Sequence, residues 1–371
     1  MSASLNPSLA RADGNQPAPG SCRVFAEGDD LYDAMVEQIS QASETVLLES
    51  YIFAGDEIGW LLAEALAQRA RSGVLVRVHL DAAGTLFAGT EELFRYLHQA
   101  GVEARWFNRW RWRDPLHYNR RNHRKLLVLD QSCVFVGGFN IHRESSRSII
   151  GERRWRDVHV CVEGRLGSQA AGQFNDLWSG HVSGKAPPWD GQYRILPSTT
   201  GVCRRTLYCL YLDALTGARR SIDLATPYFV SDRRFREALA SASERGVDVR
   251  ILIPLRGDNR LARWAGHALA RPLARRGVRF FEYLPRMLHS KLTLIDEQWT
   301  MLGSANADYR SFFINQELNL VSRAPVMCRQ LKAVFMEDLA QSRAMDSSAL
   351  KYRGLMGGLA KLLGKLLRRW L

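Results

Sequence analysis

An internal repeat limits the folds that are open to this chain of 371 residues. The same order of helical and strand-like segments occurs twice, judged by apolar spacing and by glycines at expected helix ends. The matching segments are helices 30–43 and 208–218, strands 45–53 and 221–229, helices 58–71 and 233–245, strands 74–80 and 247–253, helices 91–100 and 261–275, and strands 101–107 and 277–281. Alternating helices and strands favour an α/β architecture. We therefore predict two duplicated lobes, each a mixed sheet flanked by helices, with a site at the pseudo-twofold interface.

The chain length fits two domains, each able to bury its own core. We expect an N-terminal lobe at 22–185 and a C-terminal lobe at 195–345, joined through the Gly/Pro-rich stretch 183–197. Residues 1–21 are rich in Ser, Pro, Ala and Gly, which is typical of a disordered tail and not of a signal peptide. Residues 350–371 form a separate amphipathic segment.

The pattern H-x-K-x-x-x-x-D stands at the corresponding place of each half. Its residues are His123, Lys125 and Asp130 in the first half and His289, Lys291 and Asp296 in the second. With nine His and seven Lys in the chain, random placement gives only about 0.2 H-x-K triplets. Two triplets, each followed at the same offset by Asp, are therefore a specific signal of function.

These residue types suit cleavage of a phosphodiester. Residues two apart on a strand face the same side, so each His should project beside its Lys. The turns 137–140 and 303–306 add Asn140, Asn306 and Ser304 as candidate phosphate-binding residues. One His can attack phosphorus while the other protonates the leaving oxygen, and the Lys and Asn groups neutralise negative charge. This chemistry requires no metal or other cofactor.

A catalytic His usually needs a carboxylate to orient it. The repeat offers Asp157 and Glu317 at matching places, and we expect them to orient His123 and His289 respectively. Asp130 and Asp296 complete the catalytic signature, but each lies five positions beyond its Lys. That odd offset puts them on the opposite strand face. We interpret both as structural acids.

Together, these residues resemble the two HKD motifs of the phospholipase D superfamily, over about residues 23–339. The length and the segment Trp155-Arg156-Asp157 resemble the bacterial cardiolipin synthase B branch in particular. The resemblance implies transfer of a phosphatidyl group from one phosphatidylglycerol to another through a phosphohistidine, with release of glycerol. It also favours His123 as nucleophile and His289 as general acid and base. The superfamily includes water-using phospholipases and nucleases, so the motifs alone leave the acceptor open.

The net charge of +13 points to an anionic partner, either nucleic acid or an anionic membrane surface. In segment 350–371, Leu and Trp line one helix face opposite Lys and Arg, as in helices that lie on anionic membranes. Docking on the protein's own core is the alternative. The Trp/Arg-rich segment 105–113 suits a lipid headgroup boundary or stacking on bases, although Trp106 could instead pack between the lobes.

No apolar stretch is long enough to span a bilayer, and the six Cys fit buried, reduced thiols. We therefore predict a bacterial enzyme peripheral to the cytoplasmic side of the cell membrane, with phosphatidylglycerol as substrate and no obligate protein partner. A hydrolase and a nucleic-acid phosphodiesterase remain as alternatives. A non-enzymatic membrane-binding module fits less well, because both halves keep every polar group that the chemistry needs.

Overall fold

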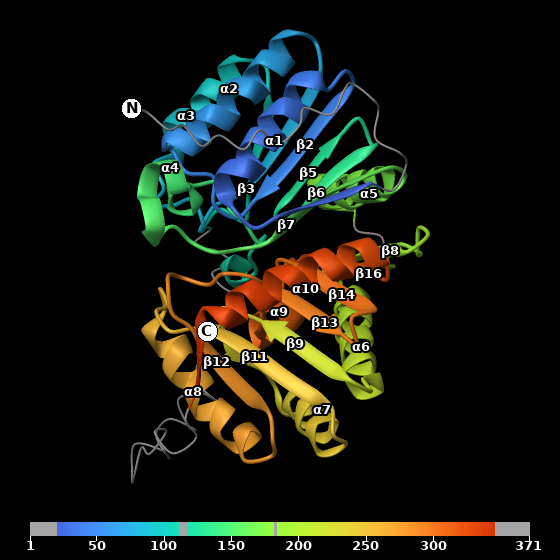
Figure 1. Cartoon of the computed structure of the whole chain (residues 1–371). Helices are drawn as coiled ribbons and strands as arrows, with labels where there is room; N and C mark the ends of the chain where they lie inside the picture. Colours follow the sequence, from blue (N-terminus) through green and yellow to red (C-terminus); the bar gives the residue numbers. More distant parts are fainter. Residues whose placement is uncertain (1–20, 111–116, 182–183, 346–371) are drawn as a thin grey trace, which may run out of the picture.

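The computed structural model describes residues 21–110, 117–181 and 184–345, which form the two stacked lobes of Figure 1. The expected tail, apart from Ser21, and the amphipathic segment 350–371 fall outside the described residues. Within the described ranges, no helix is long and apolar enough to cross a membrane.

The first lobe is built on a seven-stranded mixed sheet with the order β1-β7-β6-β5-β2-β3-β4. Its strands are β1 (Cys22–Phe25), β2 (Thr45–Ser50), β3 (Leu75–Asp81), β4 (Glu103–Phe107), β5 (Leu126–Leu129), β6 (Cys133–Gly137) and β7 (His159–Glu163). Strands β2, β3 and β4 pair in parallel, and the other neighbours pair antiparallel.

The second lobe repeats this sheet and adds one edge strand, in the order β17-β12-β11-β9-β13-β14-β16-β8. Its strands are β8 (Tyr193–Pro197), β9 (Ser221–Ala225), β11 (Asp248–Pro254), β12 (Arg279–Tyr283), β13 (Leu292–Ile295), β14 (Trp299–Gly303), β16 (Leu318–Ser322) and β17 (Ser342–Ala344). Read from the other edge, β8 to β12 match β1 to β4 place by place. The predicted duplication is confirmed.

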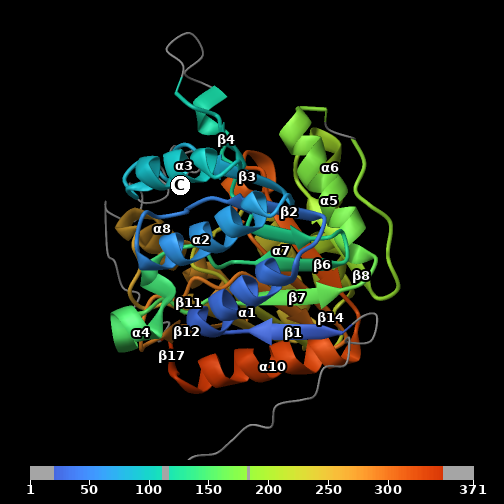
Figure 2. The same ribbon diagram turned by 90° about the horizontal axis from the view of Figure 1, so that it is seen from above.

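Helices cover both faces of each sheet. In the first lobe they are α1 (Gly28–Gln41), α2 (Glu57–Arg71), α3 (Thr90–Gln99), the one-turn α4 (Arg147–Ile150) and α5 (Leu166–Ser179). In the second they are α6 (Gly201–Gly217), α7 (Arg233–Glu244), α8 (Arg260–Ala274), the short α9 (Tyr309–Phe313) and α10 (Pro325–Ala340). Figure 2 shows α1, α2 and α3 over the outer face of the first sheet, with α10 on the far side of that sheet. The N-caps repeat as well, since Asp56 and Asp232 each accept two backbone N–H groups at the start of α2 and α7.

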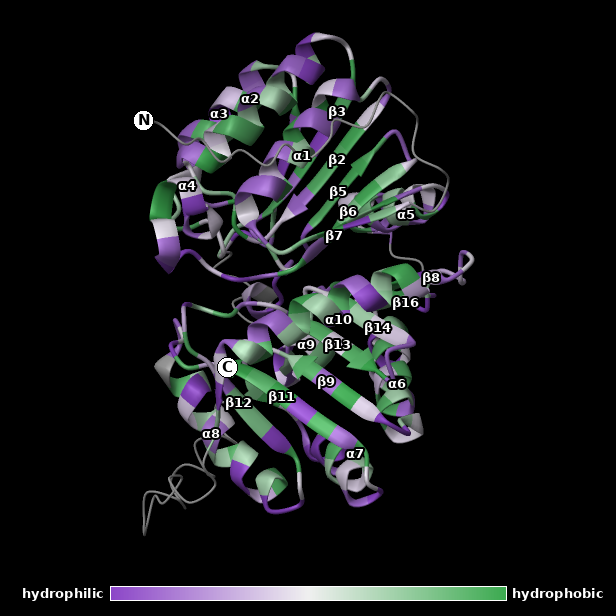
Figure 3. Cartoon of the chain, in the orientation of Figure 1, coloured by the Kyte–Doolittle hydropathy of each residue, from purple (hydrophilic) through white to green (hydrophobic). Residues whose placement is uncertain are grey.

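The two lobes share one apolar layer. Along β2, Val46 and Leu48 face the outer helices, whereas Leu47 faces the second lobe. The inner layer joins apolar residues of both sheets with Phe174 of α5 and Phe335 of α10. Apolar colouring follows the strands of both sheets in Figure 3. Because this layer belongs to both lobes, it holds them in a fixed relation and so determines how the two halves of a site meet.

A short parallel pairing recurs within each lobe, just beyond the end of its first central strand. In the second lobe β10 (Phe229–Val230) pairs in parallel with β15 (Ala307–Asp308), and in the first lobe a bridge joins Phe53 to Ile141. The remaining short elements are the 3-10 turns η1 (His117–Asn119), η2 (Arg143–Ser145) and η3 (Gly151–Arg153).

Two boundaries differ from those expected. The stretch 183–197 is not all linker, because Tyr193–Pro197 forms β8 against β16. An edge strand that ends in Pro carries little of the usual strand signal. The following helix begins at Gly201 and not at 208, because the Thr200 hydroxyl accepts the Cys203 backbone N–H as a helix N-cap.

Candidate active site

A pocket of about 220 Å³ lies between the lobes, where the two H-x-K segments meet. Its lining residues are Tyr51, Ile52, Arg121, His123, Asn140, Trp155, Tyr228, Asp258, His289, Asn306, Asp308, Arg310 and Asn315. Both motif histidines and both motif asparagines therefore border one cavity, although they come from segments far apart in the sequence.

Each H-x-K segment contacts the opposite lobe through its backbone. Strands β5 and β13 begin only after the Lys, at Leu126 and Leu292, so the His lies before the strand and not in it. The His123 N–H donates to the Gln316 carbonyl (2.9 Å), and the His289 N–H donates to the Arg156 carbonyl (2.7 Å). Gln316 and Arg156 each directly precede the carboxylate residue of their own lobe.

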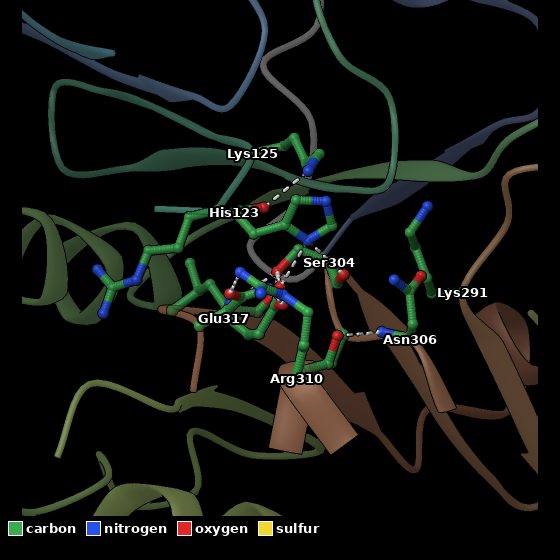
Figure 4. Close-up of polar contacts among 12 residues, drawn as sticks. His123, Lys125, Lys291, Ser304, Asn306, Arg310 and Glu317 are labelled. Atoms are coloured by element: carbon green, nitrogen blue, oxygen red, sulfur yellow. Dashed lines mark hydrogen bonds and ion pairs between the residues drawn. The ribbon is translucent and has the colours of Figure 1, made fainter. Parts of the chain in front are cut away.

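This exchange corrects the expected pairing of the carboxylates. His123 Nδ1 lies 3.0 Å from Glu317 Oε2, and His289 Nδ1 lies 2.6 Å from Asp157 Oδ2. Each carboxylate therefore contacts the His of the other lobe and not its own. Figure 4 shows the His123 ring above Glu317 and Ser304. A carboxylate only accepts, so Nδ1 donates and Nε2 remains as the basic nitrogen of each ring.

The two lysines are buried beside these pairs. Lys125 Nζ donates to the His123 carbonyl (2.7 Å) and lies 5.2 Å from the centre of the Tyr51 ring. Lys291 Nζ donates to the His289 carbonyl and lies 3.7 Å from Asp157 Oδ2. Burial and the charge on Lys291 hold the pKa of Lys125 well below its usual range. Burial lowers the pKa of Lys291 to about 8, despite the opposing charge of Asp157.

Burial also acts on the His–carboxylate pairs. It lowers the pKa of both histidines, most strongly that of His289, where Lys291 adds to the effect. It raises the pKa of Asp157. Burial alone would raise the pKa of Glu317 too, but the charge and hydrogen bond of His123 outweigh it and the pKa is lowered. A bound phosphate would raise the pKa of these His and Lys side chains, because its negative charge favours their protonated forms.

Ser304 and Gly138 stand two positions before Asn306 and Asn140. Each of them lies against a carboxylate of the site and does not face a ligand. Ser304 is fully buried, and its Oγ donates to Glu317 Oε2 (2.5 Å). Its role as a phosphate-binding residue is therefore corrected. The matching residue, Gly138, lies against Asp157, and a Cβ there would stand 2.1 Å from Asp157 Oδ1. Glycine thus leaves room for the acid that reaches His289.

The two asparagines are oriented differently. Asn140 Oδ1 faces the Ile52 N–H (3.4 Å), which leaves the amide NH₂ for a ligand. The side chain of Asn306 instead lies beside the Asp308 carboxylate and favours its ionised form, so we assign its NH₂ group to this contact. Its Oδ1 is buried and has no hydrogen-bond partner in the described part of the chain. The expectation that both amides donate to phosphate is therefore not met by Asn306.

The acids that complete the signature lie far from the pocket and are not catalytic groups. Asp130 accepts the backbone N–H groups of residues 43–45 (2.8 Å each), and Asp296 accepts those of residues 219–221 (2.7 to 2.9 Å). Both stand in β-turns with positive φ (47° and 53°). Through these hydrogen bonds each acid links the turn of its hairpin to the start of the neighbouring central strand, β2 or β9. This structural role explains why an acid stands at that place in the motif.

Other pocket residues had no sequence signal that assigned them a role. Arg121 is paired with Asp81 (3.3 Å), and Arg310 donates to the Asn119 side chain (2.8 Å). The Trp155 ring lies 5.2 Å from the His289 ring. Tyr51 and Tyr228 follow the corresponding strands β2 and β9. Their matching places in the repeat are the sequence signal that points to these two residues.

The Trp/Arg-rich segment only partly meets its expectation. Trp106 stacks on Phe94 of α3 (4.5 Å), within the first lobe and not between lobes. Trp110 is 61% exposed, and residues 111–113 lie outside the described chain. Among the described residues there is no group of three or more His, Cys, Asp or Glu able to hold a metal ion.

The duplicated lobes and the paired His–Lys half-sites define a phosphodiester-cleaving fold of the phospholipase D type. The family model "Cardiolipin synthase, PLD-like domain" matches residues 35–178 and 211–339. The chain belongs to this family, the cardiolipin synthases of the phospholipase D superfamily, which are phosphatidyltransferases.

Sequence relatives support this family assignment, and a solved structure supports the fold. The chain is 33% identical to cardiolipin synthase A of Pseudomonas putida (strain W619), over 89% of this chain and 71% of that protein. It is 32% identical to a cardiolipin synthase of Geobacillus sp. (strain WCH70), over 90% and 69%. The structure is similar to phosphatidylserine synthase of Haemophilus influenzae Rd KW20, with a TM-score of 0.71 at 14% identity over 94% and 95% of the two chains. At that identity the likeness concerns the fold alone.

Proposed function

We propose that this chain makes cardiolipin from two molecules of phosphatidylglycerol and releases glycerol, through a phosphatidyl-histidine. The observation that carries the proposal is the pair of imidazoles facing one small pocket, each held at Nδ1 by a carboxylate of the other lobe. Two basic Nε2 atoms on one pocket supply a nucleophile and a general acid, which are the two groups that a double displacement needs.

In the first displacement His123 Nε2 attacks phosphorus, and the bond from phosphorus to the glycerol oxygen breaks. His289, protonated on both ring nitrogens when the negative phosphate is bound, gives its Nε2 proton to that oxygen, and glycerol leaves. The assignment of His123 as nucleophile follows the family resemblance. Glu317 keeps a negative charge beside His123 and stabilises the positive charge that its ring acquires.

In the second displacement a hydroxyl of another phosphatidylglycerol gives its proton to His289 Nε2. Its oxygen attacks phosphorus, the P–N bond to His123 breaks, and cardiolipin forms. Asn140, which lines the pocket, supplies a hydrogen bond, and Lys125 and Lys291, which lie beside the two histidines, supply positive charge to the negative oxygens of each transition state. Asp157 supports His289 as it takes and returns the proton.

The substrate places the reaction at a membrane surface. We propose that the enzyme binds peripherally to an anionic membrane, on the cytoplasmic side of a bacterial cell. The net charge of +13 and the exposed Trp110 support this location. The amphipathic segment 350–371 is a second candidate for membrane contact.

The test is a product assay with acyl-labelled phosphatidylglycerol in mixed micelles, without added metal. We expect one glycerol per cardiolipin, and no product with His123→Ala or His289→Ala. An Asp213→Asn variant, which changes an exposed residue of α6, is the matched control. Phosphatidic acid as the sole product would assign a hydrolase. Cleavage of DNA together with inertness toward lipid would assign a nuclease.

A further inference from the structure

One wall of the pocket carries hydrogen-bond acceptors, which an anionic phosphate does not need. Asp258 lies at the pocket mouth, and both of its carboxylate oxygens contact the Tyr228 hydroxyl (2.6 and 2.7 Å). A single phenolic proton occupies only part of the acceptor capacity of a carboxylate, which has about four lone-pair positions. The remaining positions can accept hydrogen bonds from a ligand.

A second acceptor on this wall belongs to Asn306. Asn306 is 6% exposed and lines the pocket, and its Oδ1 is buried without a hydrogen-bond partner in the described residues. Its orientation is set by Asp308, because a carboxylate can bind only the NH₂ end of the amide. A buried acceptor without a partner is costly unless a ligand donates to it.

Short contacts fix this wall in place. The Thr226 hydroxyl donates to the Tyr228 carbonyl (2.9 Å) and accepts the Ala307 N–H (3.2 Å). The pairing of β10 with β15 then holds Tyr228 beside the segment that carries Asn306. Tyr228 and Asn306 are therefore parts of one rigid unit and not two independent side chains.

The first lobe has no such wall. Its matching residue, Tyr51, lies edge-on to His123 (5.0 Å), and Asn140 turns its NH₂ group to the pocket. The loop after β3 contributes no residue to the lining, and Thr85, which stands at the place that corresponds to Asp258, donates to the Asp81 carbonyl of its own turn (2.7 Å). The second lobe thus adds to the pocket a group of acceptors that the first lobe lacks, beside donors such as Asn140 and Arg310.

A ligand that fits both sides carries an anionic phosphate next to hydroxyl groups that donate. We propose that Asp258, Tyr228 and the Asn306 Oδ1 form the recognition site for the vicinal diol of the glycerol headgroup. This inference rests on the proposed function and names the specificity determinant of the same site. In the first displacement both hydroxyls belong to the leaving glycerol, whereas in the second one hydroxyl of the incoming diol is itself the attacking group, so the site acts on the intact diol in the first displacement.

The test compares two donors with the full-length protein. One is phosphatidylglycerol, and the other is phosphatidyl-p-nitrophenol, whose leaving group has no diol. Removing hydrogen bonds to a charged group should lower kcat/KM for phosphatidylglycerol about 10- to 100-fold in Asp258→Ala. Release of p-nitrophenol should change by less than about two-fold, since it does not use the diol. Asp258→Asn keeps one acceptor oxygen and should lose less than Asp258→Ala, and Tyr228→Phe should also act selectively on phosphatidylglycerol.

Three results would overturn the inference. Equal losses with both donors would mean that Asp258 only supports the fold. An unchanged rate with phosphatidylglycerol would mean that the diol binds elsewhere. A preference for phosphatidylethanolamine as acceptor that Asp258→Ala abolishes would mean that the carboxylate recognises an ammonium group. Absence of both p-nitrophenol release and cardiolipin in the unmodified protein would instead refute the proposed function itself, and the inference with it. Asp213→Asn serves as the control for loss of an acidic charge outside the pocket.

Discussion

Replacing Glu317 by Gln isolates the charge that the second lobe holds against His123. The side chain is fully buried, 3.0 Å from His123 Nδ1, and also accepts hydrogen bonds from Ser304 and Asn315. Gln is nearly isosteric, and its carbonyl oxygen can still accept the Nδ1 proton. The change therefore removes the negative charge while it keeps the shape and the tautomer.

The magnitude follows from that charge. An ion pair at about 4 Å in partly buried surroundings contributes about 4 kcal/mol, which corresponds to about 10³-fold in rate. The minimum is the difference between a charged and a neutral hydrogen bond, about 1 kcal/mol or roughly fivefold. We expect a loss of about 5- to 10³-fold in kcat, because the imidazole becomes positive only during the reaction. The pKa of His123 should also fall, since Glu317 is a cause that raises it.

The assay has two readouts. Initial rates of cardiolipin formation give the loss of activity, with Glu37→Gln on the exposed face of α1 as the matched control. Imidazole ¹⁵N spectra report which ring loses its partner. Glu317→Gln should move the resonances of His123, and Asp157→Asn those of His289. A rate within about threefold of the unmodified protein, or a shift of the His289 resonances by Glu317→Gln, would refute the exchanged pairing.

Three further outcomes follow from the same geometry. Asp130→Asn should lower the free energy of unfolding by about 1 to 3 kcal/mol in urea titrations, with activity per folded molecule unchanged, because its carboxylate binds only backbone and Ser43 groups. Its pKa is lowered in the folded state, so this stabilisation is present above the unfolded pKa of about 3.9 and is lost as the pH falls through the folded value. Gly138→Ala should nearly abolish cardiolipin formation, because its Cβ would meet Asp157 Oδ1 at 2.1 Å, and normal activity would contradict that role. In a pH profile, kcat/KM should fall as the pH rises through about 8, where the ammonium of Lys291 loses its proton, and a flat profile to pH 10 would argue against a need for that charge.

The repeat made most of the fold predictable. Helical and strand periodicities recur in the same order, and both H-x-K segments precede apolar strands, so the duplication was visible without the structure. The edge strand β8 was not visible. Its short segment ends in Pro197 and obtains its pairing from β16, which is a tertiary effect with no local pattern.

The residues of the half-sites were predictable, but their pairing was not. The sequence places Asp157 and Glu317 equally well for either His, and only the interface decides between them. Backbone hydrogen bonds carry each His across to the opposite lobe, as the contact of His123 with Gln316 illustrates. Amide orientation is equally invisible in a sequence, because Asn306 turns toward Asp308 only in the folded chain.

Transfer through a histidine is tested most directly by detecting the covalent intermediate. His289→Ala, which lacks the general acid and base, is incubated with phosphatidyl-p-nitrophenol, whose leaving group needs no proton. The reaction is quenched in alkali, where a P–N bond survives, and analysed by peptide mass spectrometry. We expect one phosphatidyl group per enzyme on the peptide that contains His123. An adduct on a carboxylate, or release of p-nitrophenol by the unmodified enzyme without any adduct in either protein, would contradict transfer through histidine.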